Sequence, residues 1–308
     1  MQKRRIGSLH VSVVGLGCNN FGRRLDAEGT RRVVHAALDA GVDFLDTADI
    51  YGGTRSEEYL GQVLGPLRER VVLATKFGMA VDDERQGAHP AYVRRAVDDS
   101  LRRLRTDRID LYQLHRPDPG VPIADTLGAL GELVREGKVR EIGCSNLDGA
   151  QLAEAASAVR PGAPGFASVQ NEYSLLHRAP EAGVLAECRR LGIAFIPYFP
   201  LASGLLTGKY RLGERPPEGT RLAGRPGGDA PLDDRRMRTV ERLRDFAEGR
   251  GRTLLELAIS WLLAREEVAS VIAGATKPEQ VRANAAAAGW TLTADELAEV
   301  NRIAPGAG

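Results

Sequence analysis

Long hydrophobic runs are missing from this chain. No stretch of about 18 apolar residues occurs in its 308 residues, so we expect no segment to span a membrane. The basic residues at the N-terminus are not followed by an apolar stretch, so we expect no signal peptide. These absences favour a protein of the cytoplasm.

An excess of charge of either sign is also missing. The 42 Lys and Arg residues balance 41 Asp and Glu residues, which leaves a formal net charge of +1 and no indication of a nucleic-acid or membrane-surface partner. Cysteine is scarce: Cys18, Cys144 and Cys188 lie far apart without metal-like spacing, which suits a reducing compartment. We therefore expect no metal site, and the sequence does not indicate the oligomeric state.

The sequence does contain a regular alternation of apolar runs and amphipathic segments. Eight runs typical of buried strands are each followed by a helical pattern; they cover residues 11–17, 42–46, 71–76, 109–115, 139–146, 167–171, 193–198 and 268–273. Strands that are apolar on both faces and alternate with helices indicate a parallel sheet. Eight units in one domain, residues 1–308, predict a (β/α)8 TIM barrel with long loops over its C-terminal face.

A doubly wound open sheet is the competing architecture. Its glycine fingerprint would have to lie at residues 15–20, where the third glycine is replaced by Asn20, so the match fails.

Ser56 is expected to be a helix N-cap, and Asp43 and Asp110 are expected to be turn or cap carboxylates.

Three of the expected strands end on side chains that can do proton chemistry. Asp46, Lys76 and His115 stand at these ends, where a barrel of this kind has its active site, and Tyr51 follows Asp46 by five residues. Tyr51 is a possible proton donor, and Lys76 could lower the pKa of that phenol from about 10. Asp46 could hold Lys76 in place and keep it charged.

His115 could donate a hydrogen bond to a carbonyl oxygen and so orient a substrate. Together the four residues fit the protonation of a developing alkoxide. Taken singly, such a lysine is more often a solvated loop residue, and such a histidine more often caps or packs. The combination at successive strand ends is what favours catalysis.

At this level the chain resembles the aldo-keto reductase superfamily over nearly its whole length. The segments that carry the resemblance are residues 43–52, 75–76, 110–115, 143–146, 169–174 and 204–210. The resemblance implies a (β/α)8 barrel, an extended NAD(P)H at the strand ends and reversible carbonyl reduction. It also implies that Tyr51 is the acid, that Lys76 and Asp46 tune it, and that His115 orients the substrate.

The resemblance further implies a set of cofactor-binding positions. Ser145, Asn146 and Gln170 match residues that bind the nicotinamide carboxamide, and Tyr198 matches the aromatic residue that stacks on the ring. Ser203, Gly204, Leu205 and Lys209 match the loop that covers the pyrophosphate. The remaining expected contacts are Gly17, Pro200, Leu201, Gly274, Thr276, Lys277, Gln280 and Asn284.

The chain departs from the family pattern at three positions. Phe199 replaces a frequent serine, Ala283 replaces a frequent glutamate near the adenine, and Gln280 stands where some members have an arginine for the 2′-phosphate. Lys277 or Arg221 could supply that charge, and we expect NADPH to be preferred over NADH.

The substrate is expected to be a small carbonyl compound, an aldehyde or a ketone. Its pocket is expected to include Asn19, Phe21 and Phe77, and the Gly- and Pro-rich loop at residues 205–236 is expected to fold over the cofactor.

Two other readings remain open. One is a cofactor-binding regulatory protein of the same fold, like channel-associated β-subunits, in which catalysis is slow or incidental. The other is an unrelated metal-dependent hydrolase, which would need several converging histidine and carboxylate ligands.

Overall fold

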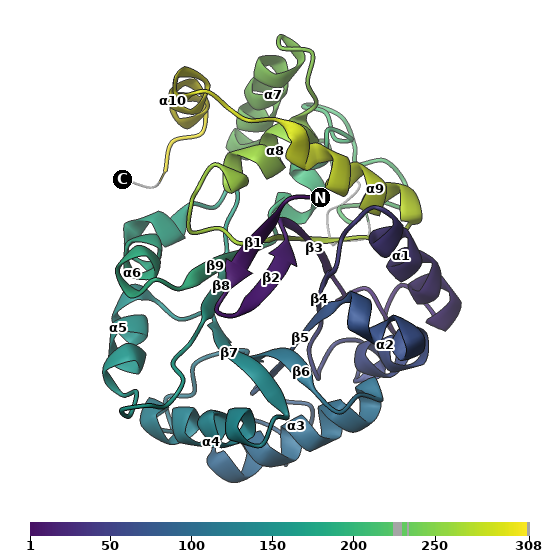
Figure 1. Ribbon diagram of the computed structural model, residues 1–308. Coiled ribbons are helices and arrows are strands. Elements are labelled where there is room, and N and C mark those ends of the chain that lie inside the picture. The colour runs from purple at the N-terminus through teal and green to yellow at the C-terminus, as the bar shows by residue number, and fades with distance from the viewer. Residues whose placement is uncertain (224–229, 233, 307–308) are drawn as a thin grey trace.

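Eight parallel strands in the computed structural model curve into a nearly closed barrel with helices around it (Figure 1). The structure describes residues 1–223, 230–232 and 234–306. In the sheet the strands follow the order β10 (Val271–Gly274), β3 (Val14–Gly17), β4 (Phe44–Asp46), β5 (Val72–Phe77), β6 (Ile109–Leu114), β7 (Val139–Ser145), β8 (Ser168–Glu172) and β9 (Ala194–Tyr198). Backbone hydrogen bonds between Phe195 and residues 267 and 269 link β9 to the segment that leads into β10. The predicted (β/α)8 barrel is confirmed.

Helices surround the barrel, and most of them pack their apolar faces against it, while Arg235–Glu248 and Ala294–Ile303 pack on other helices (Figure 1). The helices are α1 (Ala27–Asp39), α2 (Arg55–Leu64), α3 (Pro90–Leu104), α4 (Ile123–Arg135), α5 (Gly149–Ser157), α6 (Val184–Leu191), α7 (Arg235–Glu248), α8 (Leu254–Leu263), α9 (Pro278–Ala286) and α10 (Ala294–Ile303). Side-chain caps begin several of them: Asp148 with Gln151 starts α5, and Thr253 with Glu256 starts α8. No helix within the described ranges has the length and apolar character that a membrane crossing requires.

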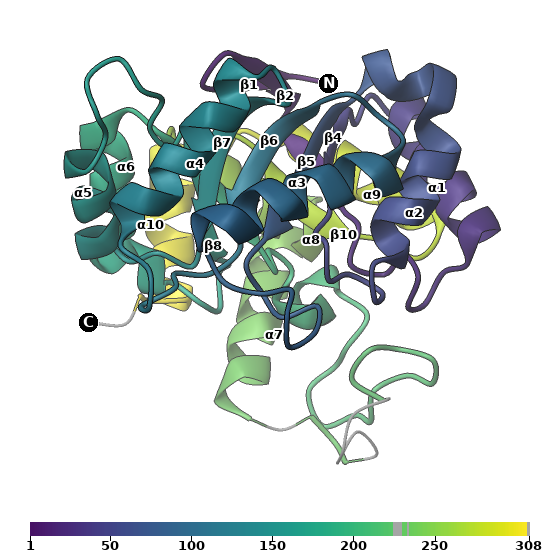
Figure 2. The ribbon, with the colours of Figure 1, turned by 90° about the horizontal axis from the view of Figure 1, so that it is seen from below.

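A hairpin that the sequence analysis missed lies across one end of the barrel (Figures 1 and 2). Its antiparallel strands are β1 (Lys3–Ile6) and β2 (Leu9–Ser12), joined by Gly7 and Ser8, with Gly7 at φ +56°. The run at residues 11–17, expected to be one strand, is therefore divided at Val13. The signal in the sequence is the two-residue Gly-Ser turn between apolar residues.

Asp43 joins this hairpin to the barrel and is not the turn or cap carboxylate that was expected. One of its oxygens accepts the Ser12 backbone N–H at 2.8 Å, and the other lies 2.6 Å from the Lys3 ammonium.

The barrel interior changes from apolar to polar along the strands. Near the hairpin it is filled by a cluster of apolar side chains, which includes Ile6, Leu9, Val11, Phe44, Ala74, Leu111, Ile196 and Ile272. Because side chains on a strand alternate between faces, the residue two places further along points inward as well. After Phe44, Ala74 and Leu111 these residues are Asp46, Lys76 and Gln113, so the C-terminal end of the barrel has a polar floor.

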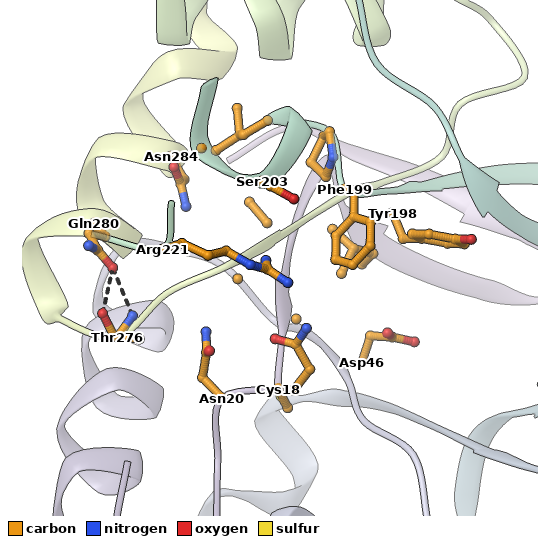
Figure 3. Close-up of a pocket in the computed structure, with 18 of the residues that line it drawn as sticks. Cys18, Asn20, Asp46, Tyr198, Phe199, Ser203, Arg221, Thr276, Gln280 and Asn284 are labelled. Atoms are coloured by element: carbon orange, nitrogen blue, oxygen red, sulfur yellow. Dashed lines mark hydrogen bonds between the residues drawn. The ribbon is translucent and has the colours of Figure 1, made fainter. Parts of the chain in front are cut away.

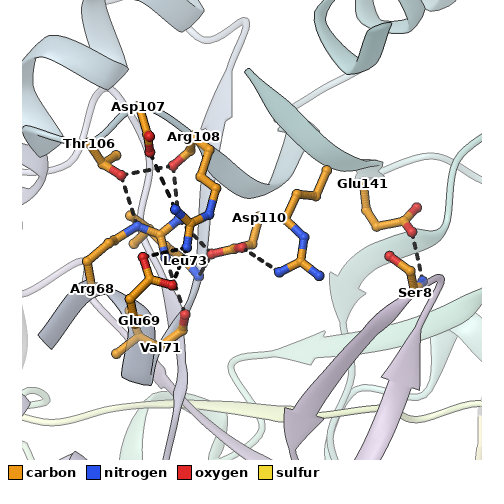
Figure 4. A network of polar contacts seen from close by, with 11 residues as sticks. Ser8, Arg68, Glu69, Val71, Leu73, Thr106, Asp107, Arg108, Asp110 and Glu141 are labelled. Atoms are coloured by element: carbon orange, nitrogen blue, oxygen red, sulfur yellow. Dashed lines mark hydrogen bonds and ion pairs between the residues drawn. The ribbon is translucent and has the colours of Figure 1, made fainter. Parts of the chain in front are cut away.

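Two further expectations at single residues were wrong. Ser56 is not an N-cap: it lies inside α2, is fully buried, and its hydroxyl donates to the Cys18 carbonyl oxygen at 3.0 Å. Asp110 does not cap a turn: it lies in β6 at the end of the barrel remote from the polar floor, where its carboxylate bridges Arg68 (2.8 Å) and Arg140 (3.0 Å) (Figure 4).

Candidate active site

A cavity of about 810 Å³ opens at the C-terminal ends of the strands, above the polar floor (Figure 3). In Figure 2 the described part of the segment between β9 and α7 projects from this same end, opposite the hairpin. The strand ends and the loops that follow them form the cavity wall. The cavity therefore lies where a barrel of this kind has its active site.

Lys76 and Asp46 form a buried ion pair beneath the cavity. The Lys76 ammonium lies 2.6 Å from Asp46 Oδ2 and also donates to the Thr47 carbonyl oxygen at 2.9 Å. Lys76 is fully buried and Asp46 is 3% exposed. Burial, the largest single effect, lowers the pKa of Lys76, but Asp46 and Tyr51 together raise it by more, so the net shift of this pKa is upward.

Two glutamine side chains hold the second oxygen of Asp46. Gln170 donates to Asp46 Oδ1 at 2.9 Å, and Gln113 donates to the same atom at 3.2 Å. Gln113 was not among the predicted site residues. The period of two along β6 places it on the same face as Leu111 and is the signal that could have found it.

Tyr51 stands beside this pair on the turn between β4 and α2. The Lys76 ammonium lies 5.2 Å from the centre of the Tyr51 ring. Burial raises the pKa of the Tyr51 phenol, and the charge on Lys76 acts in the opposite direction without reversing the shift. The expected lowering of this pKa is therefore not the net result, and the phenol keeps its proton at neutral pH.

His115 lies edge-on to Tyr51, with the ring centres 5.8 Å apart. Burial, followed by the charges of Lys76 and Arg116, lowers the pKa of His115 to about 3, so the imidazole is neutral. Its Nδ1 atom is buried and has no hydrogen-bond partner among the described residues. A neutral ring at the cavity wall can donate a hydrogen bond without adding a positive charge.

Polar groups of β7, β8 and β9 and of the residues that follow them meet at the C-terminal end of the barrel. The Ser145 hydroxyl donates to the Gln170 carbonyl oxygen at 2.6 Å. The Asn146 amide donates to the His115 carbonyl oxygen at 2.9 Å and accepts from the Tyr198 hydroxyl at 2.8 Å. Asn146 thus ties the Tyr198 ring to the loop that carries His115.

The segment after β9 forms the next part of the wall. Phe199, Ala202 and Ser203 all have positive φ, and a Cβ at Gly204 (φ +100°) would lie 3.2 Å from Lys209 Nζ, so glycine suits this position. Arg221 reaches across the cavity from the long loop, and its Cζ lies 5.1 Å from the centre of the Phe199 ring (Figure 3). The phenyl group that replaces the frequent serine therefore provides a face for a guanidinium.

The opposite wall is the start of α9. The side-chain oxygen of Gln280 accepts the Thr276 backbone N–H at 2.8 Å and lies 3.2 Å from the Thr276 hydroxyl (Figure 3). Lys277 precedes the helix at its N-cap position, and Ala283 lines the cavity as well.

The structure brings nearly all the predicted site residues to one cavity. Asp46, Tyr51 and His115 line it, with Lys76 beneath. The predicted cofactor residues in its wall are Gly17, Ser145, Asn146, Gln170, Tyr198, Pro200, Leu201, Ser203, Gly204, Lys209, Gly274, Thr276, Lys277, Gln280 and Asn284. Leu205 is buried behind the wall. Of the expected loop at residues 205–236, positions 224–229 and 233 lie outside the described residues.

Two of the three predicted substrate contacts do not reach the cavity. Asn19 lines it, but Phe21 and Phe77 are fully buried in the core outside the barrel. The reason for Phe77 is strand alternation: Lys76 points inward, so Phe77 points outward and stacks on Tyr112 with the ring centres 4.8 Å apart.

Several lining residues were missed, among them Arg24, Met79 and Arg116. They lie on loops, where no periodicity indicates the direction of a side chain. Within the described ranges, no group of three or more His, Cys, Asp or Glu side chains is placed to hold a metal ion. The metal-dependent alternative thus has no candidate ligand set in that part of the chain.

Comparison with known proteins agrees with this geometry. The family model described as "Aldo/keto reductase family" matches residues 13–305. The chain is 35% identical to "Probable aldo-keto reductase 1" of Glycine max over 303 residues, which are 96% of this chain and 86% of that protein.

Two solved structures superpose on nearly the whole molecule. The "aldo-keto reductase AKR11C1 from Bacillus halodurans (holo form)" has a TM-score of 0.82 and 34% identity, covering 100% of this chain and 97% of that one. The "glycerol dehydrogenase AKR11B4 from Gluconobacter oxydans" has a TM-score of 0.84 and 30% identity, covering 98% of this chain and 94% of that one. By sequence over almost its full length and by fold, this chain belongs to the aldo-keto reductase family.

Proposed function

We propose that this protein reduces aldehydes or ketones to alcohols with NADPH, and that Tyr51 donates the proton. Members of the family are generally NAD(P)H-dependent carbonyl reductases, so the proposal adds the proton donor, the preferred dinucleotide and the roles of the neighbouring side chains. The observation that carries it is the cluster of Tyr51, His115 and the Lys76–Asp46 pair at the floor of one cavity.

The cavity wall suits a long, phosphate-bearing ligand. Within the described part of the chain the lining basic residues are Arg24, Arg116, Lys209, Arg221 and Lys277, and the acidic ones are Asp46, which is paired with Lys76, and Glu218. Excess positive charge attracts phosphate groups, and the start of α9 adds a helix N-terminus. Gly17 and Gly274 leave their part of the wall without side chains, so a ligand can lie against the backbone.

The cofactor supplies a hydride when it is bound, and the side chains of this chain deal with the carbonyl oxygen. His115, neutral and at the wall, orients that oxygen through a hydrogen bond. Tyr51 keeps its proton until negative charge develops on the oxygen and then transfers it from the phenolic hydroxyl. The Lys76 ammonium stabilises the phenolate that remains, and Asp46 keeps Lys76 charged and in place.

The preference for NADPH is part of the proposal and rests on Lys277. This residue stands next to Thr276 and Gln280 at the start of α9 and offers a positive charge to a 2′-phosphate. Arg221, by contrast, lies over Phe199 at the end of β9. Titration of the protein with NADPH and NADH tests the preference, and equal dissociation constants would remove it.

The role of Tyr51 is tested by Tyr51→Phe, which removes only the hydroxyl. We expect the variant to lose carbonyl reduction, followed by NADPH absorbance with a panel of simple aldehydes, and to retain NADPH affinity. A variant with the kcat of the wild type would show that Tyr51 is not the acid. Wild-type protein that binds NADPH but turns over none of the panel would favour the cofactor-binding regulatory role instead.

A further inference from the structure

Arg116 is a charged residue of the cavity wall that has no role of its own in the proposed transfer of a proton from Tyr51. It directly follows His115 in the chain, its side chain is exposed, and it lines the cavity together with His115, Tyr51 and Met79. Among the described residues its guanidinium has no hydrogen-bond or ion-pair partner. Its donors are thus available to a ligand.

The backbone on both sides of Arg116 is fixed. Before it, the His115 N–H donates to the Phe77 carbonyl oxygen at 2.8 Å. After it, the Asp118 carboxylate accepts the Ala88 N–H at 2.8 Å and the Gly120 N–H at 2.9 Å. Asp118 is therefore committed to the loop backbone, and Arg116 projects from a firmly held segment.

The charge on Arg116 acts on the chemical end of the cavity. The pKa of His115 is lowered first by burial, then by the charge of Lys76 and then by the charge of Arg116. The pKa of Tyr198 is raised by burial and by Glu172, and the charge of Arg116 acts against this rise. Glu172 does not line the cavity. The anionic side chain nearest the reacting groups, Asp46, is already paired with Lys76.

We propose that Arg116 selects carbonyl substrates that carry an anionic group, a carboxylate or a phosphate, a few bonds from the carbonyl carbon. This inference rests on the proposed function and names the substrate class of that site. A guanidinium presents a planar fork of N–H donors that matches either anion. With the carbonyl held at Tyr51 and His115, the anionic end of the molecule binds at Arg116.

Matched substrate pairs test the proposal. The first pair is succinic semialdehyde and its methyl ester; the second is glycolaldehyde phosphate and glycolaldehyde. We expect kcat/KM of the wild-type protein to favour the charged member of at least one pair, with a preference that declines as ionic strength rises. The pair with the larger preference distinguishes carboxylate from phosphate.

Arg116→Gln should reduce kcat/KM for the charged member by about 10- to 100-fold, the range expected when a hydrogen bond to a charged group is lost. It should leave the neutral member nearly unchanged. Arg116→Lys keeps the charge without the fork and should give an intermediate value. Arg135→Gln, which removes an exposed arginine from the last turn of α4, is the matched control and should change neither member.

The outcomes separate the two proposals. If the wild-type protein reduces all four compounds without preferring the charged ones, or if Arg116→Gln slows both members of each pair equally, Arg116 does not select the substrate but the proposed reaction stands. If none of the four compounds nor any simple aldehyde is reduced, the proposed function itself fails.

Discussion

The Lys76 ammonium and the Asp46 carboxylate are 2.6 Å apart, and almost no surface of either is exposed to solvent. Asp46 completes β4, while Lys76 is the penultimate residue of β5. Such a pair has lost its hydration, so removing one partner leaves the other charge buried and uncompensated. The pair therefore constrains stability, and in the proposed mechanism it also constrains the proton transfer from Tyr51.

Lys76→Met should damage the protein in two measurable ways. The free energy of unfolding should fall by about 3–5 kcal/mol, because Asp46 is left buried without its partner. Carbonyl reduction should fall by about 10²- to 10⁴-fold, because the Tyr51 proton transfer loses the nearby charge. Urea unfolding and steady-state kinetics measure the two effects.

Two further variants serve as controls for Lys76→Met. Adding Asp46→Asn should restore part of the stability and none of the activity. Lys138→Met, at a partly exposed ion pair with Asp98, should leave activity intact. Wild-type turnover by Lys76→Met would contradict the role given to Lys76.

Asp49 should make stability depend on pH near neutrality. It is 1% exposed, and neither carboxylate oxygen has a hydrogen-bond partner among the described residues. Burial, and then the charge of Glu57, raises the pKa of Asp49 to about 7. Between its ordinary value and pH 7 the folded state holds a proton that the unfolded state releases. Stability therefore falls as pH rises through this window, by at most about 1.4 kcal/mol per pH unit.

Asp49→Asn should remove this loss, because the amide does not titrate. The variant should gain stability relative to wild type as pH rises from 5 to about 7, measured by urea unfolding at a series of pH values. If stability falls with pH as steeply in Asp49→Asn as in the wild type, the pKa of Asp49 is not raised.

His115 should make stability depend on pH in the opposite direction. Its pKa is lowered to about 3 in the folded state, so below its ordinary value the unfolded state takes up a proton that the folded state refuses. Stability is then lost as pH falls from about 6.5 towards 3. His115→Gln should flatten the acid side of the stability curve, and an unchanged acid side would contradict the burial of a neutral imidazole.

Arg221 should contribute to cofactor affinity. Its guanidinium lies over the Phe199 ring and reaches across the cavity (Figure 3). Arg221→Met should weaken NADPH binding by about 10- to 100-fold, the loss of one charge-assisted contact, in a fluorescence titration. Arg215→Met, an exposed arginine of the same loop outside the cavity wall, is the matched control. Equal dissociation constants for the two variants would argue against a direct contact from Arg221.

Asp110→Ala should be the most damaging of the changes remote from the cavity. The Asp110 carboxylate holds Arg68 and Arg140 and accepts the Leu73 backbone N–H at 2.9 Å (Figure 4). Its removal should cost about 3–5 kcal/mol of unfolding free energy while kcat of the surviving folded protein is unchanged. Asp107→Ala, at an 87% exposed carboxylate nearby, should leave stability close to wild type.

The end of the barrel that holds the candidate site could be predicted because position along a strand carries the information. Asp46, Lys76 and His115 come at the ends of apolar runs, and parallel strands bring their ends to one edge. The same rule, applied with the period of two, would have directed Phe77 outward and Gln113 inward. The position of a residue at a strand end does not by itself show which face of the sheet its side chain occupies, and for this reason Phe77 was wrongly included and Gln113 was omitted.

The loops and the hairpin could not be placed in the same way. Arg116 and Arg221 reach the cavity from segments without periodicity, so only tertiary contacts decide where they lie. The hairpin was missed because its first strand is short and mostly charged, with Ile6 as its single fully buried residue. Its apolar side chains fill one end of the barrel, and the local sequence does not reveal that position.

That hairpin governs the dielectric environment of a site at the other end of the molecule. Ile6, Leu9 and Val11 occupy the barrel interior in the same apolar cluster as Phe44 and Ala74, and the next inward residues along those two strands are Asp46 and Lys76. If the hairpin were removed, water would enter the barrel from the N-terminal ends of its strands and hydrate the ion pair. The electrostatic strength of Lys76 towards Tyr51 thus depends on the first twelve residues of the chain, none of which touches the cavity.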